Sequence, residues 1–150
     1  MKKGFTLIEM MLVVAIIGVL LVLLIPRVTR SMDKARERAT AKNLKSIKLA
    51  LDQYGEEPDG SFAYPTTKEQ AKEILEKAFT DGVVPRAVLR IGAGVVTSNE
   101  CYVTDDVSNI PVFGGGGWVL ITTGSYTGNV YINSTKNNLE GNPYTTYSCW

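Results

Sequence analysis

The stretch KGFTLIEMMLVVAIIGVLLVLLIPR occupies residues 3–27 and contains the main apolar run of the chain. From Phe5 to Ile25 this run holds a single charged side chain, Glu9. A helix of this length extends about 31 Å, close to the thickness of a bilayer core. The run exceeds the roughly 7–15 apolar residues of a secretory signal peptide and ends without an A-x-A-type cleavage site. The sequence therefore predicts a membrane-spanning helix.

Glu9 distinguishes this helix from a plain membrane anchor. An ionised carboxylate within lipid costs on the order of 3 kcal/mol, and less near a helix end. An acid in such a position usually has a partner or a function. Basic residues flank the helix on both sides, so charge alone leaves its orientation open.

An amphipathic helix is expected after the apolar run. One apolar face recurs at spacings of 4, 3, 4 and 3, through Thr40, Leu44, Ile47, Leu51 and Tyr54. Residues 27–53 carry a net charge of +5, and residues 54–150 carry −5. Gly55 is placed to end the helix, which is predicted over residues 5–54. Pro26 removes one backbone hydrogen bond, so a kink or local melting is predicted there.

The remaining residues predict a small α+β head. Thr67 and Gln70 form a capping-box pattern for a short helix before Gly82. Short β-branched segments then predict strands at residues 87–91, 95–97, 101–104, 118–122 and 129–133. The last two strands are expected to form a hairpin. An antiparallel sheet packed on the apolar face of the long helix is the predicted architecture.

Composition argues against most enzyme classes. The chain has 150 residues, no His, two Cys and a formal net charge of +1. It therefore lacks the commonest general base and a four-Cys metal site. No nucleophile–base pattern is present, so a membrane-tethered hydrolase or binding protein is the less favoured alternative. No cofactor, metal or nucleic-acid partner is expected.

The segment Lys3-Gly4-Phe5-Thr6-Leu7-Ile8-Glu9 resembles the processing site of type IV prepilins. Gly18 and Pro26 stand where that family usually has glycine and proline. The resemblance is specific over residues 1–30, whereas the head matches only in general plan. It implies the pilin fold, in which a long N-terminal helix packs on a small antiparallel sheet.

The resemblance also implies how the chain matures. A membrane-bound prepilin peptidase would cleave after Gly4 and methylate the new N-terminus, Phe5. Subunits would then leave the inner membrane for a helical filament with their N-terminal helices at its core. The implied parts are a leader (1–4), a transmembrane and filament-core helix (5–26), an amphipathic helix (27–54) and a globular head (55–150).

Four positions are expected to act in assembly: Phe5, Glu9, Gly18 and Pro26. Glu9 is predicted to neutralise the Phe5 ammonium of a neighbouring subunit, and a melted stretch between Gly18 and Pro26 would let the helix fit its neighbours. Cys101 and Cys149 are predicted to form a disulfide, with two free thiols as the alternative. A disulfide requires an oxidising compartment, which favours a cytoplasmic N-terminus and an external head.

The expected function is that of a structural subunit of a type IV pilus, used in adhesion, twitching motility or DNA uptake. The alternatives are a pseudopilin of a type II secretion system and a minor pilin. The predicted disulfide, and the lack of a clustered acidic calcium loop near the C-terminus, favour the pilus. The implied partners are further copies of the chain, the inner membrane, the peptidase and, indirectly, the assembly platform and its motor ATPases. The expected location is the inner membrane as a single-pass precursor, then an extracellular filament.

Overall fold

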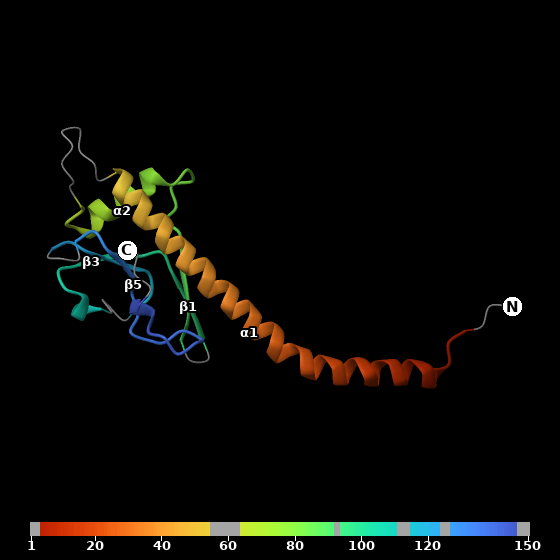
Figure 1. Cartoon of the computed structure of the whole chain (residues 1–150). Coiled ribbons are helices and arrows are strands. Elements are labelled where there is room, and N and C mark those ends of the chain that lie inside the picture. The colour runs from red at the N-terminus through yellow and green to blue at the C-terminus, as the bar shows by residue number, and fades with distance from the viewer. Residues whose placement is uncertain (1–3, 55–63, 92–93, 111–114, 124–126, 147–150) are drawn as a thin grey trace. The chain divides into compact units, whose positions relative to one another are not determined.

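The computed structural model of the chain forms two compact units, Met1–Ala35 and Arg36–Trp150, called here the N-terminal and C-terminal units. Figure 1 shows the helices and strands of the chain. The structure describes residues 4–54, 64–91, 94–110, 115–123 and 127–146.

Helix α1 extends from Leu7 to Tyr54. All side chains from residue 4 to residue 32 are exposed, including the large apolar ones, so no protein surface covers the apolar part. Among the described residues, α1 is the one helix long and apolar enough to cross a membrane. This result agrees with the membrane-spanning helix expected from the sequence.

The helix continues without interruption through Gly18 and Pro26. The melting predicted near these residues is therefore absent from this structure. Proline deletes a single backbone hydrogen bond, and the good helix formers Leu24 and Arg27 stand on either side of the Ile25-Pro26 pair. One turn later, the Thr29 hydroxyl donates a hydrogen bond of 2.9 Å to the Ile25 carbonyl, four residues earlier in the same helix.

The second half of α1 has the amphipathic face that its spacing predicts. Thr40, Leu44, Ile47 and Leu51 are all buried. The Thr40 hydroxyl accepts a bond from the Val88 N–H and donates to the Val88 carbonyl, each at 3.0 Å. This pair of bonds fixes strand β1 (Ala87–Ile91) against the helix within the C-terminal unit. Tyr54 ends α1, and its side chain lies outside the described residues.

Helix α2 spans Lys68–Ala78 and begins at the predicted cap. The Gln70 N–H donates to the Thr67 hydroxyl at 3.2 Å. The Gln70 side chain bonds back to the Thr66 N–H at 3.0 Å, one residue earlier than a regular capping box requires. Gly82 follows α2 with a φ of 66°, a left-handed conformation that suits glycine.

The strands form two sheets. Strands β1 and β2 (Gly94–Ser98) pair antiparallel. The second sheet has the order β3-β4-β5, comprising Cys101–Thr104, Trp118–Ile121 and Val130–Ile132. The predicted hairpin is confirmed because β4 and β5 pair antiparallel.

The pairing of β3 with β4 is parallel, so the prediction of a wholly antiparallel sheet is wrong in this part. The long connection between the two strands, which includes the short helix η1 (Val107–Asn109), explains the difference. A connection of a dozen or more residues returns the chain to the same end of the sheet and allows parallel pairing.

Strand β4 lies at the centre of the core, and all four of its residues are buried. One of its faces, with Trp118 and Leu120, packs in the cluster that contains the buried residues of α1 and α2. The other face, with Val119 and Ile121, packs in a second cluster beside η1. The Trp118 indole N–H donates to the Pro85 carbonyl at 2.7 Å, so the buried ring leaves no polar atom without a partner.

Candidate functional site

The predicted cleavage position precedes α1. Gly4, Phe5 and Thr6 have irregular backbone, and the helix begins at the next residue. Phe5 is 81% exposed, and nothing lies within 4 Å of a Cβ built at Gly4. Proteases require an extended, accessible peptide, so the bond between Gly4 and Phe5 has the exposure that cleavage needs.

Thr6 and Glu9 cap the N-terminus of α1 with a reciprocal capping box. The Thr6 N–H and the Thr6 hydroxyl both donate to Glu9 Oε2, each at 2.8 Å. The Glu9 N–H donates to the Thr6 hydroxyl at 3.3 Å. This geometry satisfies two of the backbone N–H groups that a helix start leaves without partners.

The capping box uses one Glu9 oxygen. Among the described residues, Glu9 Oε1 accepts no hydrogen bond, so this oxygen can accept one from a cation. Phe5 is the residue immediately before Thr6. An amine created at Phe5 would therefore form next to the end of the helix that Glu9 caps.

Sequence analysis missed the role of Thr6. The pattern Thr6-x-x-Glu9 before an apolar run is the same signal that correctly placed the cap of α2. Gly18 and Pro26 lie inside α1, more than two helical turns beyond Glu9. The structure therefore does not bring either residue close to Glu9. Nothing lies within 4 Å of a Cβ built at Gly18, so this structure gives no packing reason for that glycine.

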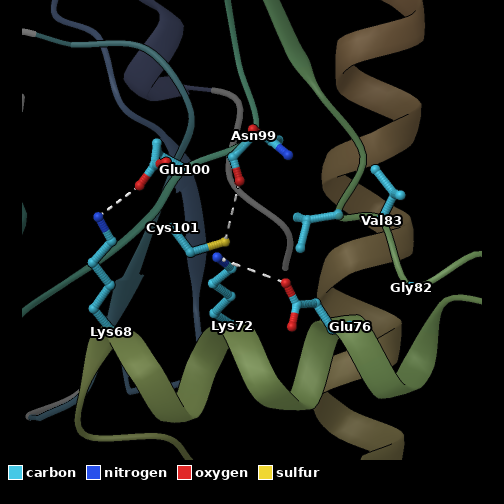
Figure 2. A pocket seen from close by; sticks show the side chains of 9 residues that line it. Lys68, Lys72, Glu76, Gly82, Val83, Asn99, Glu100 and Cys101 are labelled. Carbon is cyan, nitrogen blue, oxygen red and sulfur yellow. Dashed lines mark hydrogen bonds and ion pairs between the residues drawn. The ribbon is translucent and has the colours of Figure 1, made fainter.

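Cys101 lies beside a small polar pocket of about 200 Å³ (Figure 2). Figure 2 shows Lys68, Lys72 and Glu76 of α2 on one side of the pocket and Asn99 to Cys101 on the other. Lys68 pairs with Glu100 at 2.6 Å, and Lys72 pairs with Glu76 at 3.7 Å. Both pairs are exposed, so each contributes little to stability.

The Cys101 thiol is not activated in this pocket. Burial, with a smaller contribution from the Glu100 carboxylate, raises the pKa of the thiol to about 12. Its Sγ lies 3.9 Å from the Asn99 carbonyl, to which the S–H donates. A protonated thiol is a poor nucleophile and a poor metal ligand. Cys149, its predicted disulfide partner, lies outside the described residues.

Glu37 is a second residue that sequence analysis missed. Its Oε1 accepts hydrogen bonds from the Leu139 N–H and the Tyr144 hydroxyl, both at 2.9 Å. These bonds attach the loop before the short helix η3 (Tyr144–Thr146) to α1 within the C-terminal unit. The partners are 102 and 107 residues away in the chain, and no local pattern indicates such a contact. The described residues contain no group of three or more His, Cys, Asp or Glu side chains that could hold a metal ion.

The first 25 residues match the model of the prokaryotic N-terminal methylation motif. The chain is also similar to type II secretion system core protein G of several bacteria. The protein of Pseudomonas aeruginosa is 38% identical over 76 residues, 51% of each chain. The protein of Escherichia coli is 33% identical over 75 residues, half of each chain, and that of Vibrio cholerae is 34% identical over 76 residues. No solved structure matches the chain significantly.

These similarities confirm the resemblance to the type IV pilin superfamily that the first 30 residues predict. The chain spans about half the length of the curated relatives it matches. Those relatives are core proteins of a secretion system, so they favour the pseudopilin alternative over the expected pilus subunit.

Proposed function

We propose that the chain is a pseudopilin, a structural subunit of the filament that a type II secretion system assembles. The similarity to core protein G over half of the chain is the observation that carries this proposal. The methylation motif over residues 1–25 and the exposed apolar half of α1 support it. A type IV pilus subunit remains the second candidate, because the motif is equally compatible with both filaments.

Maturation begins in the membrane in this proposal. The precursor spans the inner membrane once, with its N-terminus in the cytoplasm. A prepilin peptidase cuts the exposed bond after Gly4 and methylates the amine of Phe5. The mature subunits are then drawn from the membrane into a helical filament by an assembly platform that a motor ATPase drives. The exposed apolar part of α1 exchanges lipid for the same part of neighbouring subunits.

Glu9 has two tasks in the assembled filament. Its Oε2 keeps the cap with Thr6, and its Oε1 accepts the methylated Phe5 ammonium of a neighbouring subunit. Both charges are then removed from water. A buried charge without its partner costs about 3–5 kcal/mol, so a subunit in the wrong register is rejected. Gly18 and Pro26 allow α1 to adapt to its neighbours.

Because Glu9 also caps the helix, a substitution at this residue can separate the effect of its charge from that of its hydrogen bonds. Glu9→Gln keeps an oxygen that can accept the Thr6 N–H, because Gln also completes a capping box. The variant therefore removes the charge and leaves the helix start intact. We expect Glu9→Gln to insert in the membrane and to be cleaved, but not to enter filaments.

Thr6→Ala is the matched control. It removes the hydroxyl of the cap at a cost of about 1 kcal/mol and keeps the Glu9 charge. We expect this variant to assemble. If Glu9→Gln assembled as well as the wild type, or if Thr6→Ala failed in the same way, the charge would not select the register.

Deletion in the native organism tests which filament the chain serves. We expect deletion to retain secreted proteins inside the cell envelope and to leave surface filaments and twitching motility unchanged. Expression of the wild-type chain restores secretion, whereas the Glu9→Gln variant does not. Loss of surface filaments with normal secretion would identify the chain as a pilus subunit.

The Cys101–Cys149 disulfide forms part of this proposal. The C-terminal unit would lie outside the inner membrane, where an oxidising compartment allows the bond. Cys101 lines the pocket of Figure 2, and we infer that the second thiol approaches its sulfur from that side. Mass spectrometry of a non-reducing digest would show the cross-linked peptide pair.

A further inference from the structure

The outer face of α1 in the C-terminal unit carries a row of basic side chains. Arg38, Lys42 and Lys45 follow one another at spacings of 4 and 3, so they share one helix face, and all three are exposed. We call these three residues the cationic stripe. Leu49 continues the row one turn later and is 67% exposed.

This face lies opposite the buried face of the same helix. Each residue of the row precedes a buried residue by two positions, as Lys42 precedes Leu44 and Lys45 precedes Ile47. Two residues correspond to about 200° around a helix. The cationic stripe therefore points away from the core of its own unit and towards whatever lies outside.

The stripe has no acidic partner within its own unit. Among the described residues, Arg38, Lys42 and Lys45 form no ion pair. The two acidic residues of α1 in this unit are engaged elsewhere. Asp52 accepts from Lys48 and from the Tyr64 hydroxyl, and Glu37 binds Leu139 and Tyr144.

A pair of adjacent acidic residues lies on the other side of the same unit. Asp105 and Asp106 follow β3, are exposed and form no ion pair among the described residues. We call these two residues the acidic turn. The Asp106 carboxylate caps η1 by accepting the Ser108 N–H at 2.9 Å, and the Asp105 carboxylate accepts from Asn109 at 3.2 Å. Both side chains are thus held in defined positions.

The packing places the stripe and the turn on opposite sides of the sheet. The buried apolar residues of α1 belong to the cluster on one face of β4, whereas Val107, which begins η1, and Ile110, which follows it, pack in the cluster on the other face. Two complementary surfaces on opposite sides cannot pair in a closed two-fold dimer. If they bind each other, they make a head-to-tail contact, which repeats as a closed ring or, when its rotation does not close, as an open helical assembly.

We propose that the cationic stripe of one subunit binds the acidic turn of a second copy of the chain in the filament. This inference rests on the proposed filament function and specifies the contact between C-terminal units. Leu49 lies at the end of the stripe, where the contact buries it. Because the charges are exposed, they select the partner surface and the register more than they add affinity.

Zero-length cross-linking tests the contact directly. A carbodiimide joins a lysine amine to a carboxylate only when the two are in contact. Filaments of the full chain should give cross-linked peptides between Lys42 or Lys45 and the acidic turn. Mixing isotopically labelled and unlabelled subunits should show that these cross-links join different chains, and detergent-solubilised monomers should lack them.

Charge reversal provides the functional test. We expect Lys42→Glu with Lys45→Glu to lower recovered filament by roughly tenfold, because like charges brought together across an interface oppose association. Adding Asp105→Lys and Asp106→Lys to the same chain should restore assembly. The single variant Lys42→Glu is compared with a matched control, Lys136→Glu. Lys136 is also exposed but lies off the stripe, so the control makes the same charge change elsewhere on the surface.

The outcomes separate this inference from the proposed function. Filaments that form normally after reversal of the stripe, or that lack these cross-links, would overturn the inference and leave the proposed function standing. If the stripe variant instead lost only its association with anionic vesicles, the stripe would bind lipid head groups and the inference would be wrong. If the wild-type chain formed no filament, the proposed function and this inference would fail together. Equal amounts of membrane-inserted precursor show that the variants fold.

Discussion

Replacement of Gly128 by alanine tests how the C-terminal unit holds the segment that enters α2. Gly128 has a φ of 81°, and a Cβ built there would lie 2.2 Å from Cζ of the Tyr64 ring. The Tyr64 hydroxyl in turn donates to Asp52 Oδ1 at 2.9 Å. The glycine therefore allows an aromatic ring to pack between the β4–β5 connection and α1.

The expected cost has two parts. A left-handed alanine costs about 1–2 kcal/mol, and the overpacking against the ring adds about 1–3 kcal/mol. Gly128→Ala should therefore destabilise the C-terminal unit by about 2–5 kcal/mol. At about 4 °C per kcal/mol for a domain of this size, the Tm should fall by roughly 8–20 °C.

The variant Gly141→Ala separates the cost of the left-handed backbone from the cost of overpacking. Gly141 has a similar φ of 86°, but nothing lies within 4 Å of its Cβ position. Gly141→Ala should lower the free energy of unfolding by only about 1–2 kcal/mol, which is the backbone cost alone. Thermal unfolding of the full chain in detergent, followed by near-ultraviolet circular dichroism, measures both variants. In a Tyr64→Ala background, Gly128→Ala should cost no more than Gly141→Ala. Equal losses for the two glycine variants in the wild-type background would refute the packing argument.

Three further predictions concern the same unit. Glu37→Ala leaves the Leu139 N–H and the Tyr144 hydroxyl without an acceptor and should cost about 2–4 kcal/mol in denaturant unfolding, with Glu37→Gln losing clearly less. Thr67→Ala removes the cap of α2 and should cost about 1 kcal/mol by the same measurement. After reduction, Cys101 should resist iodoacetamide at pH 8 until the chain unfolds, because a pKa of about 12 leaves it with a thiolate fraction roughly a thousandfold below that of a free thiol. Rapid alkylation of the folded, reduced chain would contradict that prediction.

Local patterns were enough to predict both α-helices and the five strands, though not the short helices η1 and η3. The spacing of Thr40, Leu44, Ile47 and Leu51 identified the buried face of α1, and the structure confirms it. The Thr67 cap and the positions of the strands also follow from short-range signals. These features depend on side-chain periodicity and turn chemistry, which act within a few residues.

Long-range contacts were not predictable in this way. Parallel pairing of β3 with β4 depends on the route of the intervening chain, and the Glu37 contacts span more than a hundred residues. The capping role of Thr6 was within reach of the sequence, because the pattern is local. Glu9 takes part in this cap in addition to the assembly role that we propose for it.

We infer that the chain is processed at its N-terminus to become a filament subunit. Mass spectrometry of the N-terminal peptide, from chain purified with the cell envelope and from any sheared surface filaments, tests it most directly. We expect a peptide that begins at N-methylated Phe5, and we expect this peptide to be found with the envelope. A mature chain that keeps Met1 to Gly4 would contradict the account and leave a membrane-anchored domain without a filament role.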